Sequence, residues 1–173
     1  EKSEFLSRPR FLAVSEFGPR NVLYHEGRKH RVIRSLLPVG DPEARFTQAK
    51  ICRACGALHT GENLRADVCI QCRTSLDAHT CEFLPNLFEM TAVSTQRADR
   101  INCDEEERLR QGYEVTTHFR FSRIEGRERK SHAEVRDSGG NPLLSLIYGP
   151  AADLWRINRR WRRSGMHGYT MDL

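Results

Sequence analysis

Cys52-Arg-Ala-Cys55 and Cys69-Ile-Gln-Cys72 are two C-x-x-C pairs separated by 13 residues. Each pair makes a tight turn that directs two sulfur atoms toward one point, and two such turns supply the four ligands of a tetrahedral zinc ion. Gly56 follows the first pair, where this turn favours a residue that tolerates positive φ. The sequence therefore predicts that Zn²⁺, held by Cys52, Cys55, Cys69 and Cys72, fixes the loop 52–72.

Other uses of these cysteines fit the spacing less well. Six cysteines would suffice for three disulfides, but the two C-x-x-C pairs are typical of a metal site. A redox C-x-x-C normally opens a helix, whereas here the motif is doubled and a polar loop joins the two pairs. Iron–sulfur proteins space their four cysteines differently. Four cysteines also close the coordination shell, so a structural zinc is expected and a catalytic zinc is the weaker alternative.

Several residues near the two pairs are expected to play no part in metal binding. His59, His79 and Cys81 lie close enough in sequence to replace a ligand, but each is interpreted as a bystander, and Cys103 as a buried or half-buried thiol. Zinc binds thiolates, so the site implies a reducing compartment, and we expect the chain to be cytoplasmic.

Length and composition set the scale of the fold. The chain has 173 residues, enough for one domain or two small ones, and its 38% hydrophobic content predicts a modest core. No apolar run approaches the roughly 20 residues of a membrane span, and Glu1-Lys-Ser-Glu4 opens without an apolar leader segment. The absence of an initiating Met suggests a processed product or a piece of a longer protein.

Hydrophobic periodicity predicts strands in the first half of the chain. Residues 22–25 and 30–33 flank a turn at 26–28 and form a hairpin, and a strand with one better-buried face is expected from 88 through 95. We divide the chain into an N-terminal hairpin unit (1–45), a zinc-binding insert (46–82) and a C-terminal part (83–173). His25-Glu26 in the hairpin is interpreted as a structural pair.

The C-terminal part is expected to hold a short helix and an antiparallel meander. Asp104 to Gly112 has a capping box and early carboxylates that suit a helix N-terminus, so its acids need no catalytic role. Strands at 115–122, 127–135 and 143–148 are separated by turn sequences. Residues 154–163 fit a helix or a strand, and the strand is favoured because Arg159 is the only misfit on its apolar face. The predicted fold class is α+β, a mostly antiparallel β-sheet module with a four-cysteine zinc knuckle insert and a short helix.

The positive charge is concentrated at one end. The net charge is +5, and residues 154–173 alone carry five arginines against Asp172. A basic segment on a nearly neutral body indicates a nucleic-acid site, here DNA, although a solvated surface is the plainer interpretation. Trp155 and Trp161 either stack bases between the arginines or belong to the core. The candidate nucleic-acid-binding residues are Arg156, Arg159, Arg160, Arg162, Arg163, Arg28, Lys29 and Arg31.

Five strings together carry a family resemblance: Tyr24-His-Glu-Gly-Arg28, Arg97-Ala-Asp-Arg-Ile101, Asp104-Glu-Glu-Glu-Arg108, Gly112-Tyr-Glu114 and Leu154-Trp-Arg-Ile-Asn-Arg159. Over about residues 10–165 the chain resembles the C-terminal accessory region of large bacterial DEAD/DEAH-box-type helicases and their partners. That region is a domain of unknown function with cysteine pairs, found in DISARM-type anti-phage systems and in relatives of repair helicases. The resemblance implies a helicase motor domain or subunit as a partner and a role in phage defence. The motor's phosphate loop and acidic box are absent from this chain.

These observations lead to one main functional hypothesis and two alternatives. The main hypothesis is a zinc-stabilised DNA-binding accessory module of a helicase-type complex, without membrane contact and without enzymatic activity of its own. The first alternative is a protein-docking module of the same kind of complex, and the second is a zinc enzyme. No phosphate-binding loop, nucleophile elbow or H-E-x-x-H motif occurs in the sequence.

Overall fold

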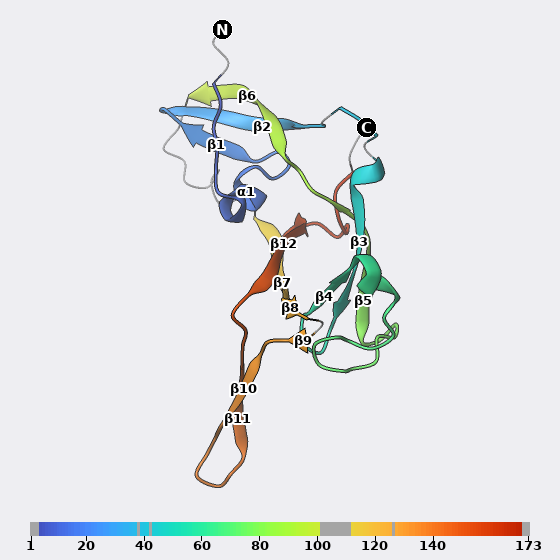
Figure 1. The fold of residues 1–173 in the computed structure, drawn as a ribbon. Coiled ribbons are helices and arrows are strands. Elements are labelled where there is room, and N and C mark those ends of the chain that lie inside the picture. The colour runs from blue at the N-terminus through green and yellow to red at the C-terminus, as the bar shows by residue number, and fades with distance from the viewer. Residues whose placement is uncertain (1–3, 38, 42, 101–111, 126, 171–173) are drawn as a thin grey trace. The chain divides into compact units, whose positions relative to one another are not determined.

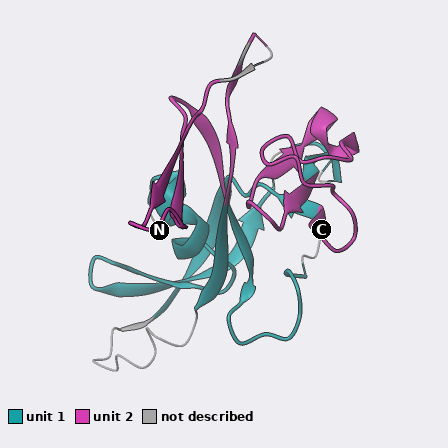
Figure 2. Ribbon diagram, turned by 90° about the horizontal axis from the view of Figure 1, so that it is seen from below, with its two compact units in different colours: residues 1–47, 86–117, 156–173 teal, residues 48–85, 118–155 magenta. Residues whose placement is uncertain are grey.

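The computed structural model describes residues 4–37, 39–41, 43–100, 112–125 and 127–170. These residues form mostly antiparallel β-sheets with one short α-helix and a cluster of four cysteines, which confirms the predicted fold class (Figure 1). The chain divides into two compact units, shown in Figure 2. Unit 1 comprises residues 1–47, 86–117 and 156–173, and unit 2 comprises residues 48–85 and 118–155.

Unit 1 contains a three-stranded antiparallel sheet in the order β1-β2-β6. Strands β1 (Val22–His25) and β2 (Arg28–Leu36) form the predicted hairpin. Its turn residues Glu26 and Gly27 both have positive φ, 46° and 72°, as the tight turns preferred by hairpins require. Strand β6 (Ala92–Arg100) pairs with the other side of β2.

The single strand predicted over residues 88–95 is wrong. Strand β5 (Cys81–Phe88) ends where that strand was expected to begin, and β6 starts only at Ala92. The two strands belong to different sheets, because β5 lies beside β3 whereas β6 lies beside β2. An alternating pattern continues across such a break without marking it, so periodicity alone joined the end of one strand to the start of the next.

The helix of the structure was not predicted. Helix α1 (Arg10–Glu16) follows Pro9, whose fixed φ of −54° suits the start of a helix. None of the described helices is long and apolar enough to span a membrane. The helix predicted from Asp104 to Gly112 lies outside the described residues except for Gly112, as does Cys103.

An aromatic cluster packs the end of the chain within unit 1. The rings of Tyr113 and Trp161 are 5.0 Å apart, and Tyr169 meets Trp161 edge-on at 5.8 Å. The Tyr113 hydroxyl donates to the Pro19 carbonyl at 2.8 Å, and the Tyr169 hydroxyl bonds the Asn158 side chain. Trp161 is therefore part of the packing of unit 1, which corresponds to the core interpretation of this residue.

The first segment of unit 2, residues 48–85, contains the cysteine pairs. Strand β3 (Phe46–Cys52) begins in unit 1, continues into unit 2 and lies between β4 (Leu58–Thr60) and β5. The turn between β3 and β4 contains the first cysteine pair, and the 3-10 helix η2 (Gly61–Arg65) follows β4. A second 3-10 turn, η1 (Glu43–Arg45), precedes β3. Ala49, Ile51 and Leu58 are buried here, so the sheet places its apolar side chains beside the cysteines.

The predicted three-stranded meander forms only in part, because its second and third strands pair as a hairpin but its first strand pairs elsewhere. Strand β7 (Tyr113–Phe121) pairs with β12 (Ala152–Trp161), which confirms the strand interpretation of that segment. Strand β12 carries two tryptophans, so it makes more favourable cross-strand side-chain contacts with β7 than the polar stretch 127–135 could. The chain between them folds into two separate hairpins. Their strands are β8 (Arg123–Ile124) with β9 (Arg127–Glu128), and β10 (Ser131–Arg136) with β11 (Pro142–Tyr148).

Candidate functional site

The four cysteine sulfurs form a compact cluster suitable for zinc. The Sγ atoms of Cys52 and Cys72 are 3.7 Å apart, as are those of Cys55 and Cys69, and all four lie within 4.8 Å of one another. A tetrahedral Zn²⁺ with Zn–S bonds of about 2.3 Å requires sulfurs about 3.8 Å apart. The described residues therefore bring together all four of the predicted ligands in the spacing that the metal needs.

The first cysteine pair adopts a knuckle closed by backbone hydrogen bonds. The Cys52 N–H donates to the Ala57 carbonyl at 3.0 Å, and the Gly56 N–H donates to the Cys52 carbonyl at 2.8 Å. Gly56 has φ 78°, as the sequence predicted. Strand β7 supports this knuckle in two ways. The buried His118 donates from Nδ1 to the Gly56 carbonyl at 3.0 Å, and the backbones of Phe119 and Ala57 form an isolated parallel β-bridge.

The second pair repeats this geometry with different residues. The Cys69 N–H donates to the Thr74 carbonyl at 2.8 Å, and the Arg73 N–H donates to the Cys69 carbonyl at 3.0 Å. Arg73 occupies the left-handed position with φ 65°, where the first knuckle has glycine. The Lys130 ammonium donates to the Gln71 carbonyl at 3.0 Å. The supporting residues His118 and Lys130 lie far away in sequence and were not predicted.

Hydrogen bonds within the second knuckle reach the sulfurs of Cys69 and Cys72 and affect the ionisation of these thiols. The Gln71 N–H lies 3.4 Å from Cys69 Sγ, and the Thr74 hydroxyl lies 3.1 Å from Cys72 Sγ. Burial opposes ionisation of Cys72, yet the bonds from Thr74 and the neighbouring thiols lower its pKa to about 6. Burial raises the pKa of the Cys55 and Cys69 thiols. A metal ion must displace these protons, so binding is expected to weaken as the pH falls.

None of the three expected bystanders belongs to the cluster found among the described residues. His59 is fully buried on β4, and burial, together with the charges of Lys50 and Arg120, lowers its pKa. Burial raises the pKa of the Cys81 thiol. The His25 ring lies 3.1 Å from the Glu4 carboxylate, beside Glu26, at an exposed site that offers a metal no buried ligand.

Three of the eight candidate nucleic-acid residues have structural roles. Arg156 donates to the Phe11 carbonyl at 2.6 Å and lies over the Phe11 ring, and Arg160 pairs with Glu114 at 2.6 Å. The bond from Arg160 holds the pKa of Glu114 below its ordinary value. Lys29 is only 7% exposed, so its side chain is not offered to a nucleic acid. Arg159 is half-buried and has a partner within the protein.

The remaining candidates are exposed and are joined by residues that the sequence reasoning missed. Arg28, Arg31, Arg162 and Arg163 are exposed, and none has an ion-pair partner among the described residues. Arg34 on β2 and Arg97 on β6 are also exposed and were not among the predicted residues. The pairing of β6 with β2 therefore concentrates positive charge that lies in two distant parts of the sequence.

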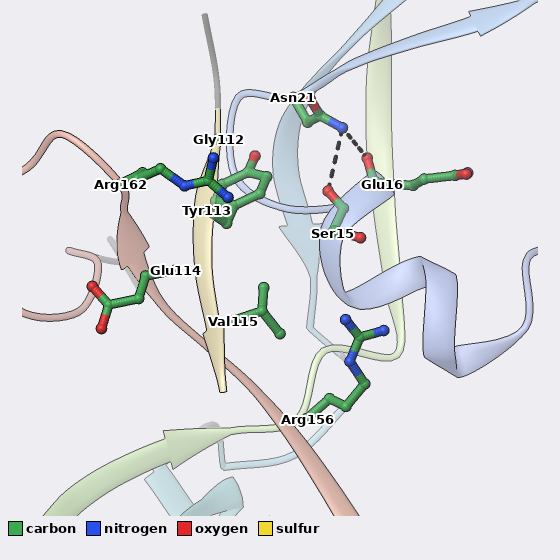
Figure 3. A pocket seen from close by; sticks show the side chains of 9 residues that line it. All are labelled: Ser15, Glu16, Asn21, Gly112, Tyr113, Glu114, Val115, Arg156 and Arg162. Atoms are coloured by element: carbon green, nitrogen blue, oxygen red, sulfur yellow. Dashed lines mark hydrogen bonds between the residues drawn. The ribbon is translucent and has the colours of Figure 1, made fainter. Parts of the chain in front are cut away.

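A cavity of about 640 Å³ lies within unit 1 between α1, β7 and β12 (Figure 3). Figure 3 shows Arg162 beside Tyr113 and Arg156 below Ser15, with Val115 between the two arginines. The lining residues are Ser15, Glu16, Asn21, Gly112, Tyr113, Glu114, Val115, Arg156 and Arg162. No local pattern in the sequence indicates this cavity, because its walls come from three distant segments.

Both tryptophans have aromatic or cationic partners within their own units. Trp161 belongs to the aromatic cluster of unit 1, and Trp155 in unit 2 holds the Arg120 guanidinium 5.1 Å from its ring centroid. Each indole thus has a packing role in the protein, and base stacking is not needed to explain either residue.

A comparison of the chain with known family models, with curated proteins and with solved structures finds no match in any of the three.

Proposed function

We propose that this protein is a zinc-stabilised accessory module that binds the phosphate backbone of DNA through unit 1. Zn²⁺ bound by the four cysteines would hold unit 2 in its fold, and the module would have no enzymatic activity of its own. The spacing of the sulfurs supports the metal, because it matches a closed tetrahedral thiolate shell. Zinc thiolates also support a reducing, cytoplasmic setting.

The basic sheet is the observation that carries the DNA-binding proposal. Arg28, Arg31, Arg34 and Arg97 are exposed on β2 and β6 and have no ion-pair partner among the described residues. The strand register places Arg31 opposite Gln96, Arg34 opposite Ser94 and Arg97 opposite His30, so no acid faces these arginines across the strands and an anionic partner would neutralise them. The side chains of β1, β2 and β6 that the structure describes include no carboxylate to neutralise them. A polyanion is the partner that this charge distribution fits best.

The role in a helicase-type complex rests on the five strings that resemble accessory regions of bacterial helicases. In that setting a motor domain or subunit would move along DNA while this module holds the backbone. A place in phage defence follows from the same resemblance. The absence of a phosphate-binding loop supports the assignment of any ATPase activity to the partner.

Fluorescence anisotropy with labelled DNA at several salt concentrations tests the proposal. Replacing Arg31, Arg34 and Arg97 by alanine should weaken binding of all sequences alike and make the slope of log K against log salt shallower by about 0.9 for each phosphate that is no longer neutralised. A matched variant with alanine at Arg53, Arg65 and Arg123, exposed arginines of unit 2, should bind as the parent does. Equally weakened binding in both variants, or parent-like binding in both, would refute the basic sheet as the DNA site.

One observation favours protein docking as a second function. The β10–β11 hairpin aligns Val135 with Leu144 and Ala133 with Leu146, and Tyr148 extends the same apolar face. All of these side chains are exposed, with Tyr148 70% exposed. A two-stranded hairpin of this kind is only marginally stable in water, and a partner would stabilise it. Binding to a candidate motor subunit that survives high salt and nuclease, and that Leu144→Ser with Leu146→Ser abolishes, would support this function.

A further inference from the structure

We propose that the cavity of unit 1 binds the phosphorylated end of a nucleic-acid strand, with the terminal phosphate on Arg162 and the terminal nucleotide along the cavity toward Arg156. This inference rests on the proposed function and makes it more specific, because it adds a site for strand ends to a surface for the backbone. Nothing in the zinc cluster or the basic sheet requires it.

The charges that line the cavity favour an anion. Its two lining carboxylates already have partners outside it, since Glu16 binds Arg8 at 2.9 Å and Glu114 binds Arg160 at 2.6 Å. The side chain of Arg162 has no hydrogen-bond or ion-pair partner among the described residues. Within the part of the chain that the structure describes, the cavity therefore presents unneutralised guanidinium charge while its acids are neutralised.

The Arg162 guanidinium lies at the cavity wall beside Gly112. The Arg162 N–H donates to the Gly112 carbonyl at 2.8 Å, and the guanidinium lies next to Gly112, 3.3 Å from where a Cβ would stand. A side chain at that position would displace the guanidinium. Its five donors form a planar fork at the cavity wall, and this geometry binds phosphate oxygens in pairs.

The rest of the cavity suits a nucleotide in size and polarity. Its volume of about 640 Å³ is within the usual range of small-ligand sites, and Val115 and Tyr113 give it an apolar wall against which a base or sugar can lie. The Asn21 amide donates to the Ser15 and Glu16 carbonyls at 3.3 and 2.7 Å, which leaves its oxygen as an acceptor. Arg156 has one nitrogen on the Phe11 carbonyl and retains further donors.

A terminal phosphate matches Arg162 better than an internal one. A phosphate monoester carries a charge of about −1.5 to −2 at pH 7 and three strong acceptor oxygens, whereas a phosphodiester carries one charge. The monoester can therefore engage the guanidinium fork and still accept from a second donor.

The test uses three fluorescent single-stranded oligonucleotides of one sequence with a 5′-phosphate, a 3′-phosphate or no phosphate, bound to the zinc-loaded chain. One phosphorylated form should bind about tenfold more tightly than the unphosphorylated form. Arg162→Ala should abolish that preference, and Arg162→Lys should retain only part of it because lysine lacks the fork. Arg163→Ala, which removes an exposed arginine outside the cavity lining, should leave the preference intact.

Competition and control experiments distinguish a site for free nucleotides from a site for strand ends, and the further inference from the proposed function. Competition by a nucleoside monophosphate would show that the cavity also takes the free nucleotide, whereas competition only by phosphorylated oligonucleotides would assign it to strand ends. Equal affinity for all three oligonucleotides, or an equal loss of preference in the Arg162 and Arg163 variants, would overturn the inference while leaving backbone binding in place. Absence of binding by every oligonucleotide would refute the proposed function itself.

Discussion

The two units of this protein are stabilised in different ways. In unit 2 the buried residues Cys52, Ala57 and Cys69 surround the sulfur cluster, and the partly buried Cys55 and Leu76 pack against them. In unit 1 a sheet and an aromatic cluster provide the packing, and no cysteine among its described residues takes part. A metal can hold a loop that is too polar to pack, whereas unit 1 depends on the fit of its side chains.

The chain contains one reporter for each unit. It has two tryptophans, and Trp155 lies in unit 2 while Trp161 lies in unit 1. A Trp155→Phe variant therefore reports on unit 1 by fluorescence, and a Trp161→Phe variant reports on unit 2. With these two variants, the unfolding of each unit can be followed separately.

Removal of the metal should have the largest effect. A structural zinc contributes on the order of 10 kcal/mol to folding, so a chelator or Cys69→Ser should unfold unit 2. Trp155 fluorescence should shift to the red, while Trp161 should change little. Metal content measured by mass spectrometry should fall from one zinc per chain to none.

The control for this prediction is Cys81→Ser, which changes a cysteine that is not in the cluster. It should retain one zinc and the fluorescence of both reporters. If Trp161 shifted together with Trp155 on chelation, the two units would depend on the metal alike, and the distinction between them would fail.

An added methyl group at Gly18 should produce the next largest effect, in unit 1 only. A Cβ at this position would stand 2.6 Å from Cζ of the Tyr113 ring, so Gly18→Ala forces the ring to move. Overpacking of this kind costs about 2 kcal/mol. Urea unfolding followed at Trp161 should show the reduced stability, with zinc content unchanged.

Gly165→Ala is the matched control, since a Cβ at Gly165 meets nothing within 4 Å. Its unfolding midpoint should equal that of the parent. A parent-like midpoint for Gly18→Ala as well would mean that Tyr113 can move freely, and the aromatic cluster would not be a packing constraint.

Substitutions at the left-handed position of each knuckle should have the smallest effect. Gly56 and Arg73 occupy the same left-handed position, with φ 78° and 65°. Gly56→Ala should cost about 1 kcal/mol, because nothing lies near its Cβ and only the backbone is strained, whereas Arg73→Gly should be neutral or stabilise slightly. Chelator competition for zinc at equilibrium would measure both, and a loss of affinity in Arg73→Gly would show that the arginine has another role.

Local patterns in the sequence were sufficient for the metal site and for the first hairpin. The ligands of a knuckle are three residues apart, and the turn after His25 is set by Glu26 and Gly27, so neighbouring residues determine both structures. The same local reasoning joined β5 to β6, because alternation does not record which sheet a strand enters. It also assigned exposed roles to Lys29 and Arg156, whose environments depend on distant segments.

The sequence by itself determined the four clustered cysteines, the hairpin β1–β2 and the predominance of strands, since each follows from spacing and periodicity over a few residues. The tertiary structure alone decided that β7 pairs with β12, that β6 adds its arginines to β2, and that Arg162 faces a cavity while Arg160 is neutralised by Glu114. These features depend on contacts between residues tens of positions apart. Such contacts are selected by the burial and charge balance of the whole unit, and no local pattern in the chain encodes them.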